Sequence, residues 1–390
     1  MRVRIGTGIS THGDARIGAI EAAHAAGQGL DGARADLAVV FAAGAHLAAP
    51  EATLEGVHEA LRPPALVGCG AAGVLGCGAE HEGGTAVAVW AAALGDGDAT
   101  TFHATAEQVD ETVAISGMER LAGASGAILL PDPLTFPTEA LLAELAAHAP
   151  GVPIVGGLAS ARTAAGGTAL FHGDAVVEGG AVGVRLDGVD LLPCVSQGAA
   201  PVGPELTVTA AEGNVIAELG GRPALDRIRE AVAELDARER TLVAGGLLIG
   251  LAVEGALPDG APPGYGPGDF LVRGLLGADP VAGTLSVAAP VRAGQVVRLH
   301  ARDAAAADAD LHDQLRLRVE ALGGAAAGAL AFACHSRGRE MFGVADHDAG
   351  LLVDALDGAP SAGFFAAGEI GPVGGASFIH TFTATVALFG

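Results

Sequence analysis

The sequence predicts an α/β protein made of two related domains, in which mixed β-sheets pack with helices. Three observations predict this class: a unit of strand, helix, strand and strand recurs, its helices are amphipathic, and glycines follow its second strand. A length of 390 residues, half of them hydrophobic, suits two domains with substantial cores.

The repeated unit occurs three times. The first copy starts at Asp36 and contains the strands DLAVVFAAG, ALVGCGAAG and TAVAVWAA with the helix EATLEGVHEAL. The second copy starts at Gly126 and contains GAILLPD, VPIVGGLAS and TALFHGD with the helix TEALLAELAAHA. The third copy starts at Gly328 and contains GALAFACHS, SAGFFAAGEIG and FIHTFTATVALF with the helix HDAGLLVDAL. Each crossover is long enough to return a parallel neighbour, and the glycine turn then reverses the chain, so each copy predicts a mixed sheet.

The segment between the second and third copies holds further elements. TLVAGGLLIGLAVEG, which starts at Thr241, is followed by FLVRGLL and GQVVRLHARD and is a weaker match to the unit, with its helix reduced. Apolar residues at helical spacing predict one helix after GGRP, with Pro223 in its first turn, and another over about 304–322. We place the domain boundary near residue 220, which gives domains 1–220 and 221–390.

Composition excludes several classes of function. A net charge of −24 repels nucleic acid and anionic lipid, and no stretch has the pattern of a signal peptide or a membrane span. Four cysteines are too few for a disulfide framework, so we expect a soluble cytoplasmic protein. GCGAAG lacks the following helix of a dinucleotide site, and the thirteen histidines show no zinc-ligand spacing. The sequence therefore predicts neither a cofactor nor a metal ion.

Several long motifs resemble one known family. GDFLVRGLLGADP, GQVVRLHARDA, ALAFACHSRGREMFG and GFFAAGEIGPVGG with FIHTFTATVALF resemble the FIST C-terminal domain in order and spacing. VGCGAAGVLG, GVPIVGGLAS and VSQGAAPVGPELTVTAAEGNVIAELGGRPAL resemble the FIST N-terminal domain. The resemblance implies a stand-alone bacterial protein that senses a small ligand, with amino acids proposed for the family, and passes its signal to a partner protein. No enzyme activity is established for the family as a whole.

The polar residues after the strand that ends in Cys334 are the first candidates for a ligand site. Cys334 is interpreted mainly as a small buried hydrophobe, with a nucleophilic role as the alternative. Arg337 either stays solvated or caps a helix, or it clamps a ligand carboxylate. His335 replaces the asparagine that similar proteins often carry, in Cys-Asn-Gly-Arg-Gly-Arg, and so changes the hydrogen-bonding groups there.

Glu369 is a lone acid in an apolar stretch, and it needs a partner because an unpaired buried carboxylate costs several kcal/mol. An arginine such as Arg273 or Arg302 would supply that partner, and so would the ammonium group of a ligand. His380 is interpreted as a satisfied core group. We expect the ligand site where the glycine-rich strand ends meet, with contributions from Gly70, Ser160 and Gly368.

The sequence thus favours a protein that binds a small polar metabolite, such as an amino acid. Two alternatives stay open. One is a hydrolase or lyase that uses Cys334 or Glu369 with His380, and the other is a protein-interaction scaffold with a vestigial pocket.

Overall fold

The computed structural model describes residues 2–109, 112–253 and 265–390. By their contacts the residues divide into two compact units. The first unit holds the chain up to Val195 together with Leu311–Ile379 and Thr383–Gly390, and the second holds Ser196–Asp310 and His380–Phe382. Both contain β-sheets packed with helices, so the predicted α/β class is confirmed. The first unit joins the N-terminal half of the chain to its C-terminal segment.

The first unit contains three mixed sheets, whose strands follow in spatial order. The first sheet consists of β1 (Arg4–Ser10), β6 (Ala86–Ala93), β2 (Leu37–Ala43), β3 (Ala65–Gly70), β11 (Ala169–His172) and β12 (Ala175–Glu178). The second consists of β25 (Ala376–His380), β24 (Glu369–Val373), β10 (Ile154–Gly157), β9 (Gly126–Pro131), β13 (Ala181–Asp187), β7 (Asp98–Val109) and β8 (Thr112–Ser116). The third consists of β14 (Leu191–Gln197), β26 (Thr383–Phe389), β22 (Gly328–Cys334), β23 (Ser361–Ala366), β4 (Val74–Gly76) and β5 (Ala79–His81).

The three predicted repeats form the centres of these three sheets. In each, two parallel strands are joined through a helix, and a third strand returns antiparallel to the first: β2, β3 and β6, then β9, β10 and β13, then β22, β23 and β26. The connecting helices are α2 (Pro50–Ala60), α3 (Thr138–His148) and α8 (His347–Ala355). One strand assignment was wrong, because TALFHGD forms β11 of the first sheet, whereas β13 returns the chain in the second repeat.

Each repeat gives a hairpin to the sheet of another repeat. The hairpin β4–β5 of the first repeat pairs with β23 of the third, and β11–β12 of the second pairs with β3 of the first. The hairpin β24–β25 of the third repeat completes the cycle, since β24 pairs with β10 of the second. Every exchanged hairpin adds antiparallel to the second parallel strand of its host. The first unit is therefore a cyclic assembly of three similar sheets.

One glycine in each repeat marks the same place in this assembly. Gly68, Gly156 and Gly363 lie opposite Val40, Leu129 and Ala331 in the parallel ladders. A Cβ atom on any of the three glycines would overlap the carbonyl oxygen of the residue opposite. The glycines after the predicted strands are thus required by close backbone approach, and they fix how the three repeats align residue by residue.

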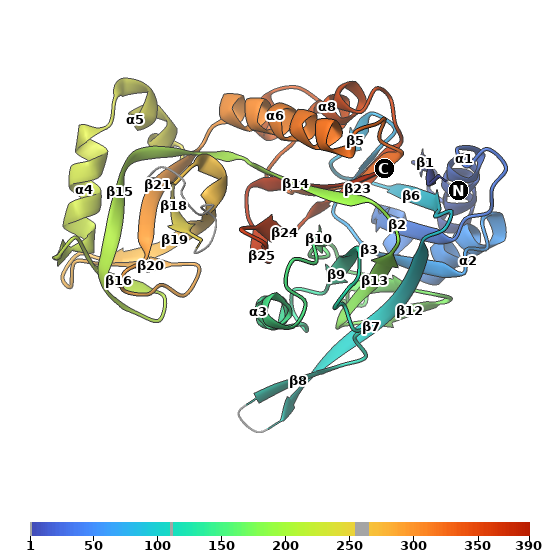
Figure 1. Cartoon of the computed structure of the whole chain (residues 1–390), viewed down its shortest axis with the longest axis horizontal. Helices are drawn as coiled ribbons and strands as arrows, with labels where there is room; N and C mark the ends of the chain where they lie inside the picture. Colours follow the sequence, from blue (N-terminus) through green and yellow to red (C-terminus); the bar gives the residue numbers. More distant parts are fainter. Residues whose placement is uncertain (1, 110–111, 254–264) are drawn as a thin grey trace. The chain divides into compact units, whose positions relative to one another are not determined.

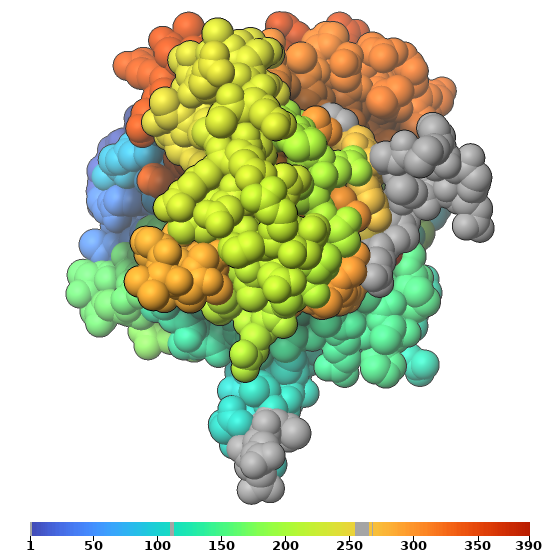
Figure 2. Space-filling model, turned by 90° about the vertical axis from the view of Figure 1, so that its left-hand side faces the viewer, coloured from blue at the N-terminus to red at the C-terminus, as the bar shows by residue number. Residues whose placement is uncertain are grey.

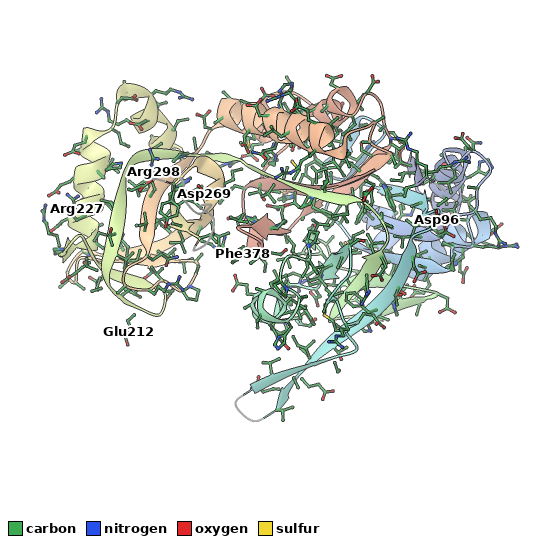
Figure 3. All side chains as sticks on the ribbon, in the orientation of Figure 1. Asp96, Glu212, Arg227, Asp269, Arg298 and Phe378 are labelled. Atoms are coloured by element: carbon green, nitrogen blue, oxygen red, sulfur yellow. The ribbon has the colours of Figure 1, made fainter. Side chains whose placement is uncertain are left out.

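The second unit is an antiparallel sheet that closes on itself. Its strands follow the order β15 (Ala199–Glu212), β21 (Val296–Arg302), β18 (Leu247–Ala252), β19 (Phe270–Asp279), β20 (Thr284–Val287), β16 (Val215–Leu219) and β17 (Arg222–Pro223), and β15 also pairs with β16. The weaker fourth copy of the repeat was wrong here, because β18 and β19 pair antiparallel, whereas the repeat requires two parallel strands. The predicted helix after GGRP is α4 (Ala224–Glu234), which buries Ile228 and Ala231 while Arg227 lies on its outer side and pairs with Glu230 (Figure 3).

The other helices complete the units. They are α1 (Ala15–Gln28), α5 (Ala237–Ala244), α6 (Ala304–Leu322), α7 (Arg339–Phe342) and the short 3-10 helices η1 (Gly44–Leu47) and η2 (Pro267–Asp269). The prediction of α6 over about 304–322 is confirmed, whereas α1 is a helix that the repeat pattern missed. α1 and α2 lie side by side on the first sheet (Figure 1). Figure 2 shows the β7–β8 hairpin projecting from the surface of the first unit.

Candidate functional site

The three glycine-rich turns that follow β3, β10 and β23 meet in the first unit. The amide of Leu158 donates to the Gly368 carbonyl at 2.8 Å, and the Ala367 amide donates back to the Leu158 carbonyl at 3.0 Å. The Ser160 amide donates to the Gly70 carbonyl at 3.2 Å, and a further bond joins Phe365 to Gly73 at 3.0 Å. The structure therefore brings together Gly70, Ser160 and Gly368, as the repeat predicted.

The Ser160 hydroxyl connects two of these turns. It accepts a hydrogen bond from the Ala72 amide at 2.9 Å and donates one to the Phe365 carbonyl at 2.5 Å. At the two equivalent contacts the backbones of neighbouring turns bond directly, from the Ala367 amide to the Leu158 carbonyl and from the Ser160 amide to the Gly70 carbonyl. Ser160 thus replaces a direct backbone bond with a bridge through its side chain. Its role in ligand binding stays a prediction.

The alignment of the repeats shows where their chemistry differs. Residues at the end of the first parallel strand and in the turn after it occupy equivalent positions in the three repeats: Ala43 and His46 in the first, Asp132 and Thr135 in the second, Cys334 and Arg337 in the third. In the second repeat the Asp132 carboxylate accepts from the hydroxyls of Thr135 and Thr168 at 2.7 and 3.0 Å. In the third repeat the equivalent turn carries a buried cation, Arg337, whose charge acts on the buried acid Glu369.

Arg337 forms a buried ion pair with Asp348, the second residue of α8. Its Nε donates to Oδ2 at 2.6 Å and its Nη2 to Oδ1 at 2.9 Å, and the side chains are 0% and 3% exposed. Burial opposes both charges, but each partner outweighs it, so the pKa of Arg337 is raised and the pKa of Asp348 is lowered to about 2. The guanidinium carbon also lies 5.1 Å from the centroid of the Phe342 ring. The fork expected to clamp a ligand therefore holds Asp348.

One nitrogen of Arg337 stays outside this pair. Nη1 is buried and has no hydrogen-bond partner among the described residues. It carries N–H donors only, because a guanidinium has no acceptor. An unsatisfied buried donor costs roughly 1–3 kcal/mol, so this atom is an exception that requires an explanation.

Glu369 is fully buried at the start of β24. Its Oε2 accepts from the Thr383 hydroxyl at 2.6 Å and from the Thr383 amide at 3.1 Å. Oε1 has no partner with hydrogen-bond geometry in the part of the chain that the structure describes. Burial raises the pKa of Glu369 to about 8, although Thr383, Arg337 and the Cys334 thiol each favour the ionised form. Its side chain is therefore mostly protonated at neutral pH, and the cation whose charge acts on it is Arg337.

Among the remaining predicted residues, Cys334 interacts directly with Glu369. The Cys334 thiol contacts the Ser336 hydroxyl at 3.1 Å and also interacts with Glu369. His335 is exposed, and its amide donates to the Ala366 carbonyl at 3.1 Å. His380 is buried and belongs to the second unit, as do Arg273 and Arg302.

The exchanged hairpin β4–β5 adds acids that sequence reasoning missed. Glu80 accepts from the Ala349 amide of α8 at 2.9 Å, and Glu82 accepts from the Arg339 amide at 2.8 Å. Burial raises the pKa of Glu80, and the charge of Asp348 adds to this effect. Asp348 and Thr383 were also missed, because no local pattern identifies the partner of a buried charge. We name the set Cys334, Arg337, Asp348, Glu369 and Thr383 the Arg–Glu cluster.

Other kinds of site find no support in the described residues. They contain no group of three or more metal-ligating side chains. Within residues 2–109, 112–253 and 265–390, every helix is too short or too polar to cross a bilayer. A surface hollow of about 270 Å³ lies between β8 and α3, lined mainly by apolar residues such as Ile115, Leu121 and Leu141, and it is separate from the Arg–Glu cluster.

Comparison with known proteins identifies the two parts of the chain. Residues 36–222 match the FIST N domain and residues 224–372 match the FIST C domain. The uncharacterized protein Mb0898c of Mycobacterium bovis is 45% identical over 390 residues, and MT0897 of Mycobacterium tuberculosis is equally similar, with 99% of each chain covered. Rv0628c of M. tuberculosis is 44% identical over 389 residues, which cover 99% of this chain and 100% of that protein. FIST domains are generally regarded as sensory domains that bind small ligands. The chain belongs to the FIST family, with a FIST N domain followed by a FIST C domain.

Proposed function

We propose that this protein is a cytosolic sensor that binds a small polar metabolite at the Arg–Glu cluster, with amino acids as the first class to test. A separate signalling protein would receive the response. Membership of the FIST family supports a role in sensing a small ligand, and the Arg–Glu cluster supports the position of the binding site.

The observation that carries this proposal is a pair of unpartnered polar atoms in one buried cluster. Arg337 Nη1 and Glu369 Oε1 both lack a hydrogen-bond partner among the described residues. The two side chains are close enough for the charge of each to shift the pKa of the other. Because buried polar groups are normally satisfied, two such atoms together favour a site that is completed by another molecule.

The comparison between the repeats also supports this place. The equivalent turn of the first repeat carries His46, whose Nδ1 lies 3.2 Å from the Thr53 hydroxyl. In the second repeat the Asp132 carboxylate receives two hydroxyls of its own repeat. His46 Nε2 also has no partner among the described residues, but the turn of the third repeat differs because it holds a buried ion pair.

Thermal unfolding of the whole chain against the twenty amino acids and a set of small carboxylates tests the proposal. A ligand that binds only the folded state stabilises it by about 2.7 kcal/mol at a hundredfold excess over Kd, which raises the unfolding midpoint. We expect a selective shift for one compound or a narrow group, with saturation as its concentration rises.

Two variants connect that shift to the cluster. Glu369→Leu removes both carboxyl oxygens and should abolish the response. Asp132→Asn changes a buried acid of the second repeat and should leave the response in place, which controls for general loss of stability. If no compound shifts the midpoint of folded protein, or if the response survives in Glu369→Leu, the proposal is wrong.

A further inference from the structure

The two oxygens of Glu369 have different surroundings, and this difference favours one position for its proton. Oε2 receives two donors from Thr383, the hydroxyl at 2.6 Å and the amide at 3.1 Å. An oxygen that accepts two such bonds acts as the carbonyl oxygen of the protonated acid. The acid proton then lies on Oε1, the oxygen that has no partner within the described chain. In the protonated state, Oε1 is therefore a hydrogen-bond donor.

Arg337 Nη1, the other unpartnered atom of the cluster, is a donor as well. Two donors cannot satisfy each other, and neither can pair with an ammonium group, which also has only donors. An anionic oxygen accepts from both, and hydrogen bonds to a charged partner are about twice as strong as neutral ones. The chemistry of the two atoms thus selects an acceptor.

We propose that the Arg–Glu cluster recognises the carboxylate of its ligand, through Arg337 Nη1 and the protonated Oε1 of Glu369. This inference rests on the proposed function and names the group that is bound. Binding then requires the acid form of Glu369, so the affinity for a carboxylate falls once Glu369 ionises. A ligand ammonium group, where one is present, lies away from Glu369.

Burial keeps Glu369 protonated against the groups around it, because Thr383, Arg337 and a hydrogen bond with the Cys334 thiol all favour the ionised form. Thr383 faces it from β26, Cys334 from the end of β22, and Arg337 from the turn that follows. Asp348 on α8 neutralises most of the Arg337 charge by its bidentate pair. Glu80 of β5 accepts from the Ala349 amide of α8, and the charge of Asp348 acts on it. Burial is the dominant influence on Glu369 and raises its pKa to about 8.

The test uses two one-group probes, sodium acetate and methylammonium chloride, at matched ionic strength. The unfolding midpoint of the whole chain is measured at pH 6.5 and pH 9.5. We expect acetate to raise the midpoint at pH 6.5 and to lose this effect at pH 9.5, with Kd rising about tenfold for each pH unit above the pKa of Glu369. Methylammonium should give no shift at pH 6.5, where Oε1 carries its proton.

The variant Glu369→Gln separates the two possible roles of this side chain. A glutamine keeps an oxygen for Thr383 and places an N–H donor where Oε1 stands, so it copies the protonated acid. It should still bind acetate, and with equal affinity at both pH values. Glu369→Leu lacks the donor and should not respond.

Three results would overturn the inference alone. The first is stabilisation by methylammonium at pH 6.5 that disappears in Glu369→Gln, since this means that an ionised carboxylate acts as an acceptor at a pH where the acid form is required. The second is a loss of acetate binding in Glu369→Gln as complete as in Glu369→Leu. The third is a response to whole amino acids, abolished by Glu369→Leu, with no acetate response at pH 6.5; this outcome leaves the proposed function standing. If neither amino acids nor acetate bind, both the inference and the proposed function fail.

Discussion

Replacing Glu369 by glutamine should change how the stability of the first unit depends on pH. In the wild type the folded state holds the Glu369 proton far more tightly than the unfolded chain does, because the pKa is raised from 4.5 to about 8 by burial. A raised pKa stabilises the folded state fully below the unfolded value, and this contribution is lost as the pH rises through the folded value. Glutamine does not titrate, so the stability of the Glu369→Gln variant lacks this pH-dependent contribution.

The magnitude follows from the two pKa values. Each pH unit between them changes the free energy of unfolding of the wild type by about 1.4 kcal/mol relative to the variant. The difference between wild type and Glu369→Gln should be constant below about pH 4.5, fall steadily from there to pH 8, and level off above it. Over the whole interval it amounts to roughly 5 kcal/mol.

Urea unfolding at half-unit steps from pH 4 to pH 9, followed by tryptophan fluorescence, measures this difference. Trp90 is the only tryptophan of the chain, is fully buried in β6, and reports on the unit that contains Glu369. Effects of the overall charge on stability are nearly the same in both proteins and cancel in the comparison. Parallel stability curves between pH 5 and pH 8 would refute the reasoning, since they would mean that Glu369 titrates as it does in the unfolded chain.

Two further substitutions test the contacts described above. Arg337→Met leaves the Asp348 carboxylate buried without its cation and should lower the free energy of unfolding by about 3–5 kcal/mol. Adding Asp348→Leu should restore most of this loss in urea unfolding. A double variant no more stable than the single one would contradict the buried ion pair. Ser160→Ala leaves the Ala72 amide and the Phe365 carbonyl without their bridge and should cost about 1–3 kcal/mol in the same assay. An unchanged response to metabolites in Ser160→Ala would assign Ser160 to the fold alone, and a lost response would support its predicted role in binding.

The sequence predicted the repeat well because the repeat has strong local signals. Apolar periodicity located all three crossover helices, and the glycines marked the turns that the structure brings together. No local pattern in the sequence shows which strand a given strand pairs with. TALFHGD was correctly a strand, but nothing in its composition shows that it pairs with β3 of another repeat, and β18 and β19 look locally like the strands of a crossover unit.

The sequence predicted only those residues of the candidate site that stand out locally. Cys334, Arg337 and Glu369 are conspicuous because polar groups interrupt apolar strands, and the structure places them in one cluster. Their partners are ordinary in the sequence: Asp348 is one acid among many near a helix start, and Thr383 is one of several threonines on the last strand. Only the tertiary structure shows that the Arg337 fork is occupied by Asp348.

The cyclic exchange of hairpins has a consequence for how the chain folds during synthesis. When a ribosome has released the first 220 residues, β4–β5 has no sheet to join and β10 has a bare edge, because their partners β23 and β24 lie beyond residue 360. Contacts of such sequence separation make folding slow, and bare strand edges promote aggregation in the meantime. The boundary between the FIST N and FIST C domains in the sequence therefore does not separate two independently folding pieces. A truncated N-terminal half would expose the surfaces that the last thirty residues cover in the finished protein.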